Sequence, residues 1–314
     1  MPDTKEPRYS PVFNTEDADF RLISSDNVIF SVHTLILQLA SSVFKTMLSV
    51  PQPAQKLTKE LPFVELTETG TTLELLLQFI YPMKSPSYLS FNHFAEVLEA
   101  ASKYAIEGTV DALRLLLLSP RVDAERKSIQ IRPSLAEQDP LRAYAIATSM
   151  GWKAEAIQAS TLTLRTNLTS SASSSELDNM PTKYYRWLNE IHEERRVFFR
   201  RLLEEFDDEP SEYRVKKCKD CGMDPLAIWW DDYLQRATTS ASARPLGDRV
   251  FDLNILFPPD DEVDEFGCQS CPSLAVPLET LYALSRLKLK LSKRKESIKH
   301  KYINQATSAT SGAA

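Results

Sequence analysis

Residues 26–48 read "DNVIFSVHTLILQLASSVFKTML" and decide the fold of the N-terminal third of the chain. In the first part of this stretch the apolar Phe30 and Val32 alternate with the polar Ser31. The preceding "DADFRLISS" at 17–25 alternates in the same way, and polar residues join the two runs. Alternation with a period of two is typical of half-buried strands, so the sequence predicts a β-hairpin here.

The rest of the stretch changes to a helical period. We expect two short helices over residues 34–49, separated at Ser41 and Ser42, where serine is a good N-cap. A third short strand is expected at 63–68, and three more helices at 70–81, 91–108 and 109–119. Gly108 is the expected C-terminal stop of the helix that begins at residue 91. This order of elements indicates an α+β domain of about 100 residues.

These residues carry a resemblance to a known family. The segments that match, in order, are D-A-D at 17–19, F-S-V-H at 30–33, I-L at 36–37, S-x-V-F-x-x-M-L at 41–48, V-E-L at 64–66, F-I-Y-P at 79–82 and A-A-S-K-Y at 100–104. Together they resemble a BTB/POZ domain, placed at residues 16–120. The resemblance implies a protein-interaction module that is commonly dimeric and has no catalytic activity of its own.

His33 lies between the second strand and the first helix, and its role could be that of a ligand, a base or a structural group. A half-buried imidazole at such a junction most often makes hydrogen bonds that hold the turn. The resemblance also implies a structural histidine at this position. We therefore expect His33 to be structural, and Asp19 to fix the start of the sheet.

Three departures from the family bear on partners. Thr34 stands where BTB domains often have a basic residue that forms a charged pocket with the aspartate. Many dimeric members carry an extra helix or strand before the first strand, but Pro7 and Pro11 make this stretch unsuited to a helix and argue against the usual swapped dimer. The loop "PQPAQKLTKELP" at 51–62 has "LTKE" in place of the apolar-x-Glu motif of many cullin-binding members. Cullin binding is therefore an alternative that this motif does not support.

Composition limits the function classes further. The chain has 314 residues, with a net charge of -6 that argues against a surface coated by nucleic acid. We find no secretory leader and no apolar run long enough for a membrane span, so we expect a cytoplasmic or nuclear protein. Glycine-rich phosphate loops and the common hydrolase motifs are absent, and "IHEERR" around His192 lacks the second histidine of a zinc protease motif. We therefore expect no enzyme.

The middle of the chain, residues 136–207, is predicted to be helical. Residues 1–15 and 305–314 are expected to be disordered tails, and 120–135 a polar connector. Asp139 followed by Pro140 is a strong helix start. A long helix is expected over 181–206, where Arg195 interrupts the apolar stripe, so that packing against a neighbouring helix is favoured over a coiled coil. The combination of a BTB domain and a following helical region resembles a family of BTB proteins that is abundant in mushroom-forming fungi.

The four cysteines form two C-x-x-C pairs, Cys218 with Cys221 and Cys268 with Cys271. Two such pairs can complete a closed tetrahedral Zn²⁺ site, which is structural because no coordination position stays open. Unliganded thiols and thioredoxin-like redox chemistry are the alternatives. We expect one structural Zn²⁺ within a C-terminal region, residues 212–304, whose aromatic segment "LAIWWDDYL" packs a small core beside the metal.

A basic helix is predicted near the C-terminus. Eight Lys or Arg and one acid, Glu296, lie between Arg286 and Lys301. A solvated helix face is the default interpretation, and a nuclear-localisation signal or nucleic-acid contact around "KRK" at 293–295 is the alternative.

Taken together, the sequence predicts a non-enzymatic BTB-based adaptor or scaffold that recruits protein partners, with a homodimer as one candidate assembly. The alternatives are a nuclear transcriptional regulator that contacts nucleic acid through residues 212–304, and a substrate adaptor for a cullin ubiquitin ligase. No membrane partner is expected.

Overall fold

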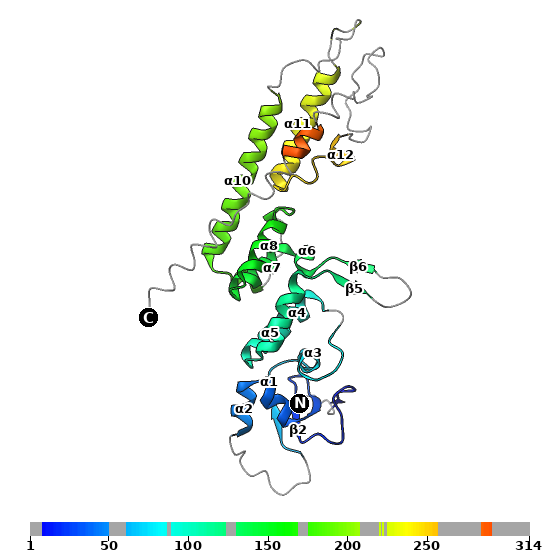
Figure 1. Cartoon of the computed structure of the whole chain (residues 1–314), viewed down its shortest axis with the longest axis vertical. Helices are drawn as coiled ribbons and strands as arrows, with labels where there is room; N and C mark the ends of the chain where they lie inside the picture. The colour runs from blue at the N-terminus through cyan, green and yellow to red at the C-terminus, as the bar shows by residue number, and fades with distance from the viewer. Residues whose placement is uncertain are drawn as a thin grey trace, which may run out of the picture. The chain divides into compact units, whose positions relative to one another are not determined.

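The computed structural model describes residues 8–49, 61–86, 89–123, 130–168, 175–207, 225–256 and 284–290, with residues 220 and 222, and the structural statements below refer to these residues. The chain divides into two compact units, with the boundary between Gln138 and Asp139. Figure 1 labels the helices and strands of both units. No helix in the described ranges has both the length and the apolar character that a membrane span requires.

The first unit contains a four-stranded sheet in the order β1-β3-β2-β4. Its strands are β1 (Arg8–Tyr9), β2 (Phe20–Ile23), β3 (Val28–Val32) and β4 (Phe63–Glu65). β2 and β3 form the predicted antiparallel hairpin, in which Phe20 pairs with Val32 and Leu22 with Phe30. β1 and β4 run parallel to β3 and β2, respectively, at the two edges.

Helices of the first unit complete an α+β domain with the predicted order of elements. They are α1 (Thr34–Ala40), α2 (Ser42–Ser49), α3 (Gly70–Ile80), α4 (Phe91–Lys103) and α5 (Glu107–Leu118), followed by the short α6 (Leu135–Gln138). The apolar stripes predicted on α3 and α4 are buried: Leu73, Leu76 and Leu77 on α3 are each 1% exposed, and Phe94 and Val97 on α4 are 0% exposed. Burial of these apolar side chains contributes hydrophobic stabilisation to the unit.

The N-terminal segment differs from the predicted tail over residues 1–15. From Arg8 onward it follows the edge of β3, and the Ser31 amide donates to the Phe13 carbonyl at 2.9 Å. Phe13 is only 3% exposed. Strand β3 is consequently buried along its whole length, since this segment covers the edge that the hairpin leaves open.

Two other local predictions in this unit are wrong. α4 ends at Lys103, and Gly108 lies in the first turn of α5; the left-handed residue between them is Ala105, with φ of 49°. The buried side chains of Tyr104 and Ile106 on either side hold the turn there. The expected connector at 120–135 contains an antiparallel pair, β5 (Arg121–Asp123) and β6 (Gln130–Arg132).

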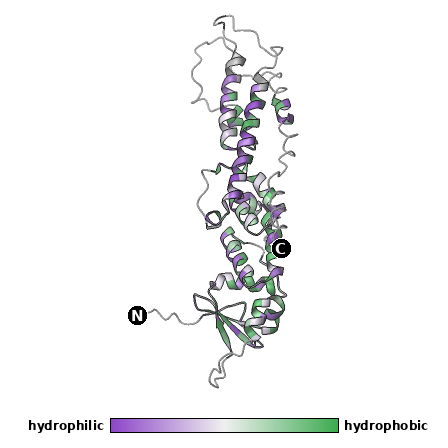
Figure 2. Ribbon diagram, turned by 90° about the vertical axis from the view of Figure 1, so that its left-hand side faces the viewer, coloured by the Kyte–Doolittle hydropathy of each residue, from purple (hydrophilic) through white to green (hydrophobic). Residues whose placement is uncertain are grey.

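The second unit is helical, as predicted. It contains α7 (Pro140–Ser149), α8 (Lys153–Thr163), α9 (Ser175–Asp178), α10 (Thr182–Asp207), α11 (Pro225–Ala243) and α12 (Leu253–Leu256), and residues 284–290 are also helical. Asp139 caps α7 as predicted, because its carboxylate accepts from the Arg142 amide at 3.1 Å. Hydrophilic colour predominates along α10 in Figure 2, in keeping with a helix that buries one face.

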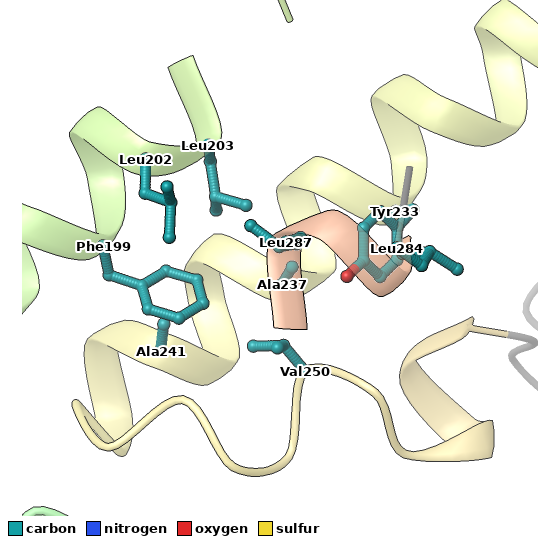
Figure 3. Packing of buried hydrophobic residues seen from close by; sticks show 9 residues of the cluster. All are labelled: Phe199, Leu202, Leu203, Tyr233, Ala237, Ala241, Val250, Leu284 and Leu287. Carbon is teal, nitrogen blue, oxygen red and sulfur yellow. The ribbon is translucent and has the colours of Figure 1, made fainter. Parts of the chain in front are cut away.

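The regions 136–207 and 212–304, which were predicted as separate, share one hydrophobic core. α10 and α11 lie side by side, and residues 284–290 pack against them (Figure 1). Figure 3 shows the buried members of this core, contributed by α10, α11, the segment after α11 and residues 284–290: Phe199, Leu202, Leu203, Tyr233, Ala237, Ala241, Val250, Leu284 and Leu287. The aromatic segment predicted to pack beside a metal thus contributes Tyr233, and partly Trp230, to a core between helices.

Arg195 was predicted to interrupt the buried face of α10, but the structure buries it within that face. Its side chain is buried, at 5% exposure, within the same face as Leu188 and Phe199. The guanidinium donates from Nε to the Pro245 carbonyl at 3.1 Å and from Nη2 to the Leu246 carbonyl at 3.3 Å. The buried charge therefore satisfies backbone carbonyls of a segment fifty residues further along the chain.

Candidate interaction surface on α1

Helix α1 exposes two large apolar side chains. Leu37 is buried at 0% exposure, whereas Leu35 is 65% and Leu39 is 80% exposed. Residues four positions apart are neighbours on a helix surface, so these two leucines form one apolar patch. Leu35 and Leu39 together are called the α1 patch below. Single exposed leucines are ordinary on protein surfaces, but adjacent ones on one helix favour a protein contact.

The N-terminus of α1 is held by Asp19. Its carboxylate accepts from the Thr34 amide at 2.7 Å and from the Thr34 hydroxyl at 2.6 Å. Burial alone would raise the pKa of Asp19, but the hydrogen bonds from Thr34 outweigh it and hold this pKa below its usual range. Asp19 was expected to fix the start of the sheet; its amide does donate to the Val32 carbonyl, while its side chain caps the helix. A negative charge at this position also complements the helix dipole.

His33 occupies the junction that the sequence predicts, and its contacts confirm a structural role. Its backbone amide donates to the Tyr81 hydroxyl at 2.8 Å, and Nδ1 lies 3.2 Å from the same oxygen. Nε2 lies 3.3 Å from the exposed carboxylate of Asp17. The partners of the imidazole are thus side chains from α3's end and from the segment before β2, and they tie the start of α1 to both.

Neighbouring groups at this junction have shifted pKa values. Hydrogen bonds from Thr15 and then from His33 lower the pKa of Asp17. Burial raises the pKa of Tyr81. The Tyr81 ring also meets Phe13 edge to face, with centroids 5.2 Å apart, so the N-terminal segment braces the same junction.

The C-terminal end of α1 is equally well anchored. Ser41 is the predicted cap of α2: its Oγ accepts from the Phe44 amide at 2.9 Å and donates to the Tyr104 carbonyl. The rings of Phe44 and Tyr104 stack with centroids 4.8 Å apart. Because both ends of α1 are held, the α1 patch is presented on a rigid support, which lowers the entropic cost of binding.

Glu68 connects this anchor to the helix α4. The carboxylate accepts from the Tyr104 hydroxyl at 2.6 Å and from Lys103 Nζ at 2.7 Å. Burial by itself would raise the pKa of Glu68, but the hydrogen bonds from Lys103 and Tyr104 lower it overall. The pKa of Tyr104 is raised far above its usual value by burial and by the adjacent carboxylate. This network ties the segment before α3 to the end of α4, beside the Phe44–Tyr104 ring stack.

The α1 patch was not identified in the sequence, although a signal was present. The helix "TLILQLA" carries apolar residues around most of its circumference, more than one buried face can accommodate. An apolar residue on the outer face of a surface helix therefore has no partner within the domain. That excess is the feature from which Leu35 and Leu39 could have been found.

The residues of the predicted metal site lie outside the described residues: Cys218, Cys221, Cys268 and Cys271. The same applies to most of the loop that bears on cullin binding, at 50–60, and to the basic segment from residue 291. Within the part of the chain that the structure describes, no group of three or more His, Cys, Asp or Glu is placed to hold a metal ion.

A comparison of the sequence with models of known protein families found a match within the first unit. Residues 11–119 match the BTB/POZ domain model. The match includes Pro11 to Thr15, which the sequence analysis placed in a tail, and ends one residue before the predicted boundary at 120. Among curated proteins, no significant match was found. BTB domains are protein–protein interaction modules, so the first unit is a module of this kind.

Proposed function

We propose, from the premise that residues 11–119 form a BTB/POZ domain, that this chain is a non-enzymatic adaptor or scaffold that pairs with a second copy through α1. The observation that carries this proposal is the α1 patch, where Leu35 and Leu39 are exposed on a helix fixed at both ends. The second unit is then the part left to recruit a different partner.

Self-association suits this surface for two reasons. A helix that meets its own copy across a two-fold axis places Leu35 and Leu39 against the same residues of the partner. Burying a leucine contributes about 1.5–3 kcal/mol. The patch alone is small, so the dimer also needs contacts around it to reach a stable interface.

Charge in the patch is expected to weaken this dimer strongly. The double substitution Leu35→Glu and Leu39→Glu should raise the dimer dissociation constant by at least about 100-fold, because two apolar contacts are lost and carboxylates are placed in the interface. Sedimentation of the full chain over a range of concentrations measures this change.

Leu115→Glu is the matched control. Leu115 on α5 is 72% exposed, close to the values of the two leucines on α1, but it lies on a different helix of the same unit. Its substitution should leave the dissociation constant unchanged. A wild-type chain that stays monomeric at about 100 µM, or equal weakening by Leu115→Glu, would contradict the proposal.

We also propose that Cys218, Cys221, Cys268 and Cys271 bind one structural Zn²⁺. The spacing of both pairs supports this site, since each C-x-x-C turn can supply two thiolates. The core of the second unit supports it as well. α11 follows the first pair and residues 284–290 follow the second, and these two segments pack together.

Metal analysis tests the zinc site directly. Full-length chain purified without added zinc should contain one zinc per chain, and Cys218→Ser should lose it, because three thiolates bind Zn²⁺ far less tightly than four. Ser270→Ala, inside the second pair but not a ligand, should keep the metal. Protein that contains no zinc, or Cys218→Ser that retains a full equivalent, rules the site out.

A further inference from the structure

His192 is buried in the second unit in a way that the proposed function does not use. It lies on α10 with 0% exposure, one turn before the buried Arg195. Its Nε2 is 3.0 Å from the Thr163 hydroxyl at the end of α8, and its Nδ1 is buried with no hydrogen-bond partner among the described residues. An unpaired polar atom in the interior is unfavourable, because it has lost its hydrogen bonds to water.

The hydrogen bonds assign the tautomer of the neutral ring. The Thr163 hydroxyl donates to the Ser160 carbonyl at 2.6 Å, so its single hydrogen is already used. Thr163 Oγ1 must therefore accept from Nε2–H of His192. The neutral ring then carries its hydrogen on Nε2 and a lone pair on Nδ1, which is the atom that would take up a proton.

Three segments meet at this point. Leu164 at the end of α8, Ile191 on α10 and Leu246 in the turn after α11 form a small buried cluster. The Leu246 amide donates to the Leu164 carbonyl at 2.9 Å, and Arg195 donates to the carbonyls of Pro245 and Leu246. The end of α8 and the turn at 245–247 are thus attached to α10 by His192 and Arg195. We call this arrangement the His192 joint.

We propose that the His192 joint is an acid-sensitive device: the neutral ring holds α8 and the 245–247 turn on α10, and uptake of a proton at Nδ1 releases them. A proton there would place a second cation in the interior, one helical turn from the Arg195 guanidinium. The hydrogen bond from Nε2 to Thr163 cannot compensate, because Nδ1–H has no acceptor in the described surroundings.

The charges on the elements that meet at the joint are of both signs. Near His192 the ionisable groups are Glu190, Glu193, Glu194, Arg195 and Arg196 on α10, Arg165 after α8, and Arg244 and Asp248 at the turn. Glu193 is paired with Arg196, and Asp248 lies 3.9 Å from Arg165 and 3.7 Å from Arg244. Glu193 and Asp248 are thus engaged with arginines, Glu190 lies 3.6 Å from Arg186, and Glu194 is exposed, while the charge of Arg196 disfavours an imidazolium.

The sign of the pH dependence follows from these contacts. Burial, followed by the charge of Arg196, lowers the pKa of His192 from 6.5 to about 4. The opened or unfolded chain takes up the proton first as the pH falls. The contribution of the neutral ring is therefore complete above about pH 6.5 and is lost between that value and about pH 4.

Hydrogen exchange of the Leu246 amide in the full chain tests the proposal. After correction for the intrinsic exchange rate, its opening constant should rise about 30-fold between pH 7.5 and pH 5. In His192→Gln the side-chain amide can still donate to Thr163 but cannot titrate, so the rise should disappear. An equal rise in both proteins would overturn the proposal.

A second measurement does not depend on a variant. Ring nitrogen chemical shifts of His192 in the wild-type chain should report the neutral Nε2–H form from pH 7.5 down to pH 5. Titration of His192 near pH 6.5, or a hydrogen on Nδ1 at neutral pH, would equally overturn the proposal. The paired carboxylates of the first unit titrate below this window, because Asp17, Asp19, Asp26 and Glu68 all have lowered pKa values.

Discussion

Gly247→Ala is expected to lower the free energy of unfolding of the second unit by about 3–5 kcal/mol. Gly247 has φ of +70°, a region that disfavours side chains. A Cβ at this position would lie 2.3 Å from Cε2 and 2.9 Å from Cδ2 of Phe199. The Phe199 ring is 1% exposed within the core of Figure 3 and has little space to move away.

Gly151→Ala separates the two causes. Gly151 has nearly the same backbone angle, φ of +69°, but a Cβ there would meet nothing within 4 Å. Its substitution should cost only about 1 kcal/mol from the backbone. Phe199→Leu combined with Gly247→Ala should recover part of the larger loss, since the smaller side chain makes room.

Tryptophan fluorescence during chemical denaturation measures both changes. All four tryptophans, Trp152, Trp187, Trp229 and Trp230, belong to the second unit, so the signal reports on that unit alone. Equal destabilisation by Gly247→Ala and Gly151→Ala would show that the contact with Phe199 has no energetic weight.

Arg195→Ala should destabilise the second unit by about 3–4 kcal/mol. The substitution removes two charge-assisted hydrogen bonds and leaves the carbonyls of Pro245 and Leu246 without this buried donor. It also leaves a cavity where the stem of the side chain packs. Arg195→Met fills much of that space, so the difference between the two variants measures the packing contribution.

Arg200→Ala is the control on the same helix. Arg200 is exposed, and its removal should change the free energy of unfolding by no more than about 0.5 kcal/mol. The tryptophan signal again follows the second unit. If Arg195→Ala were as mild as Arg200→Ala, the buried guanidinium would not be what attaches the 245–247 turn to α10.

Several features of the fold could be predicted because they depend on neighbouring residues. The alternation of Phe30, Ser31 and Val32 predicted the hairpin, and Ser41 and Asp139 predicted helix starts that the structure confirms. The order of motifs around His33 predicted the BTB/POZ domain that the family comparison supports. Periodicity, caps and short motifs act over a few residues, so they can be read directly from the chain.

The incorrect predictions have a common physical origin in partners that are distant in the sequence. Residues 8–13 lack a strong strand pattern, and the free edge of β3 and contacts with Glu74 and Tyr81 hold them. Gly108 looked like a helix end, but the turn falls at Ala105 because Tyr104 is buried against Phe44. Leu35 and Leu39 fit a helical period, and which of α1's apolar residues stay exposed depends on what α1 packs against.

By itself, the sequence determined the identity of the first unit, the helical character of the second and the structural role of His33. Tertiary structure alone decided the burial of Arg195 and His192. A charged or titratable side chain can be buried only where acceptors are available, and those of Arg195 lie at Pro245 and Leu246, fifty residues away. In the folded chain the end of α8 and the turn after α11 lie on the same face of α10. His192 and Arg195, the polar residues within the apolar stripe of that face, are therefore buried.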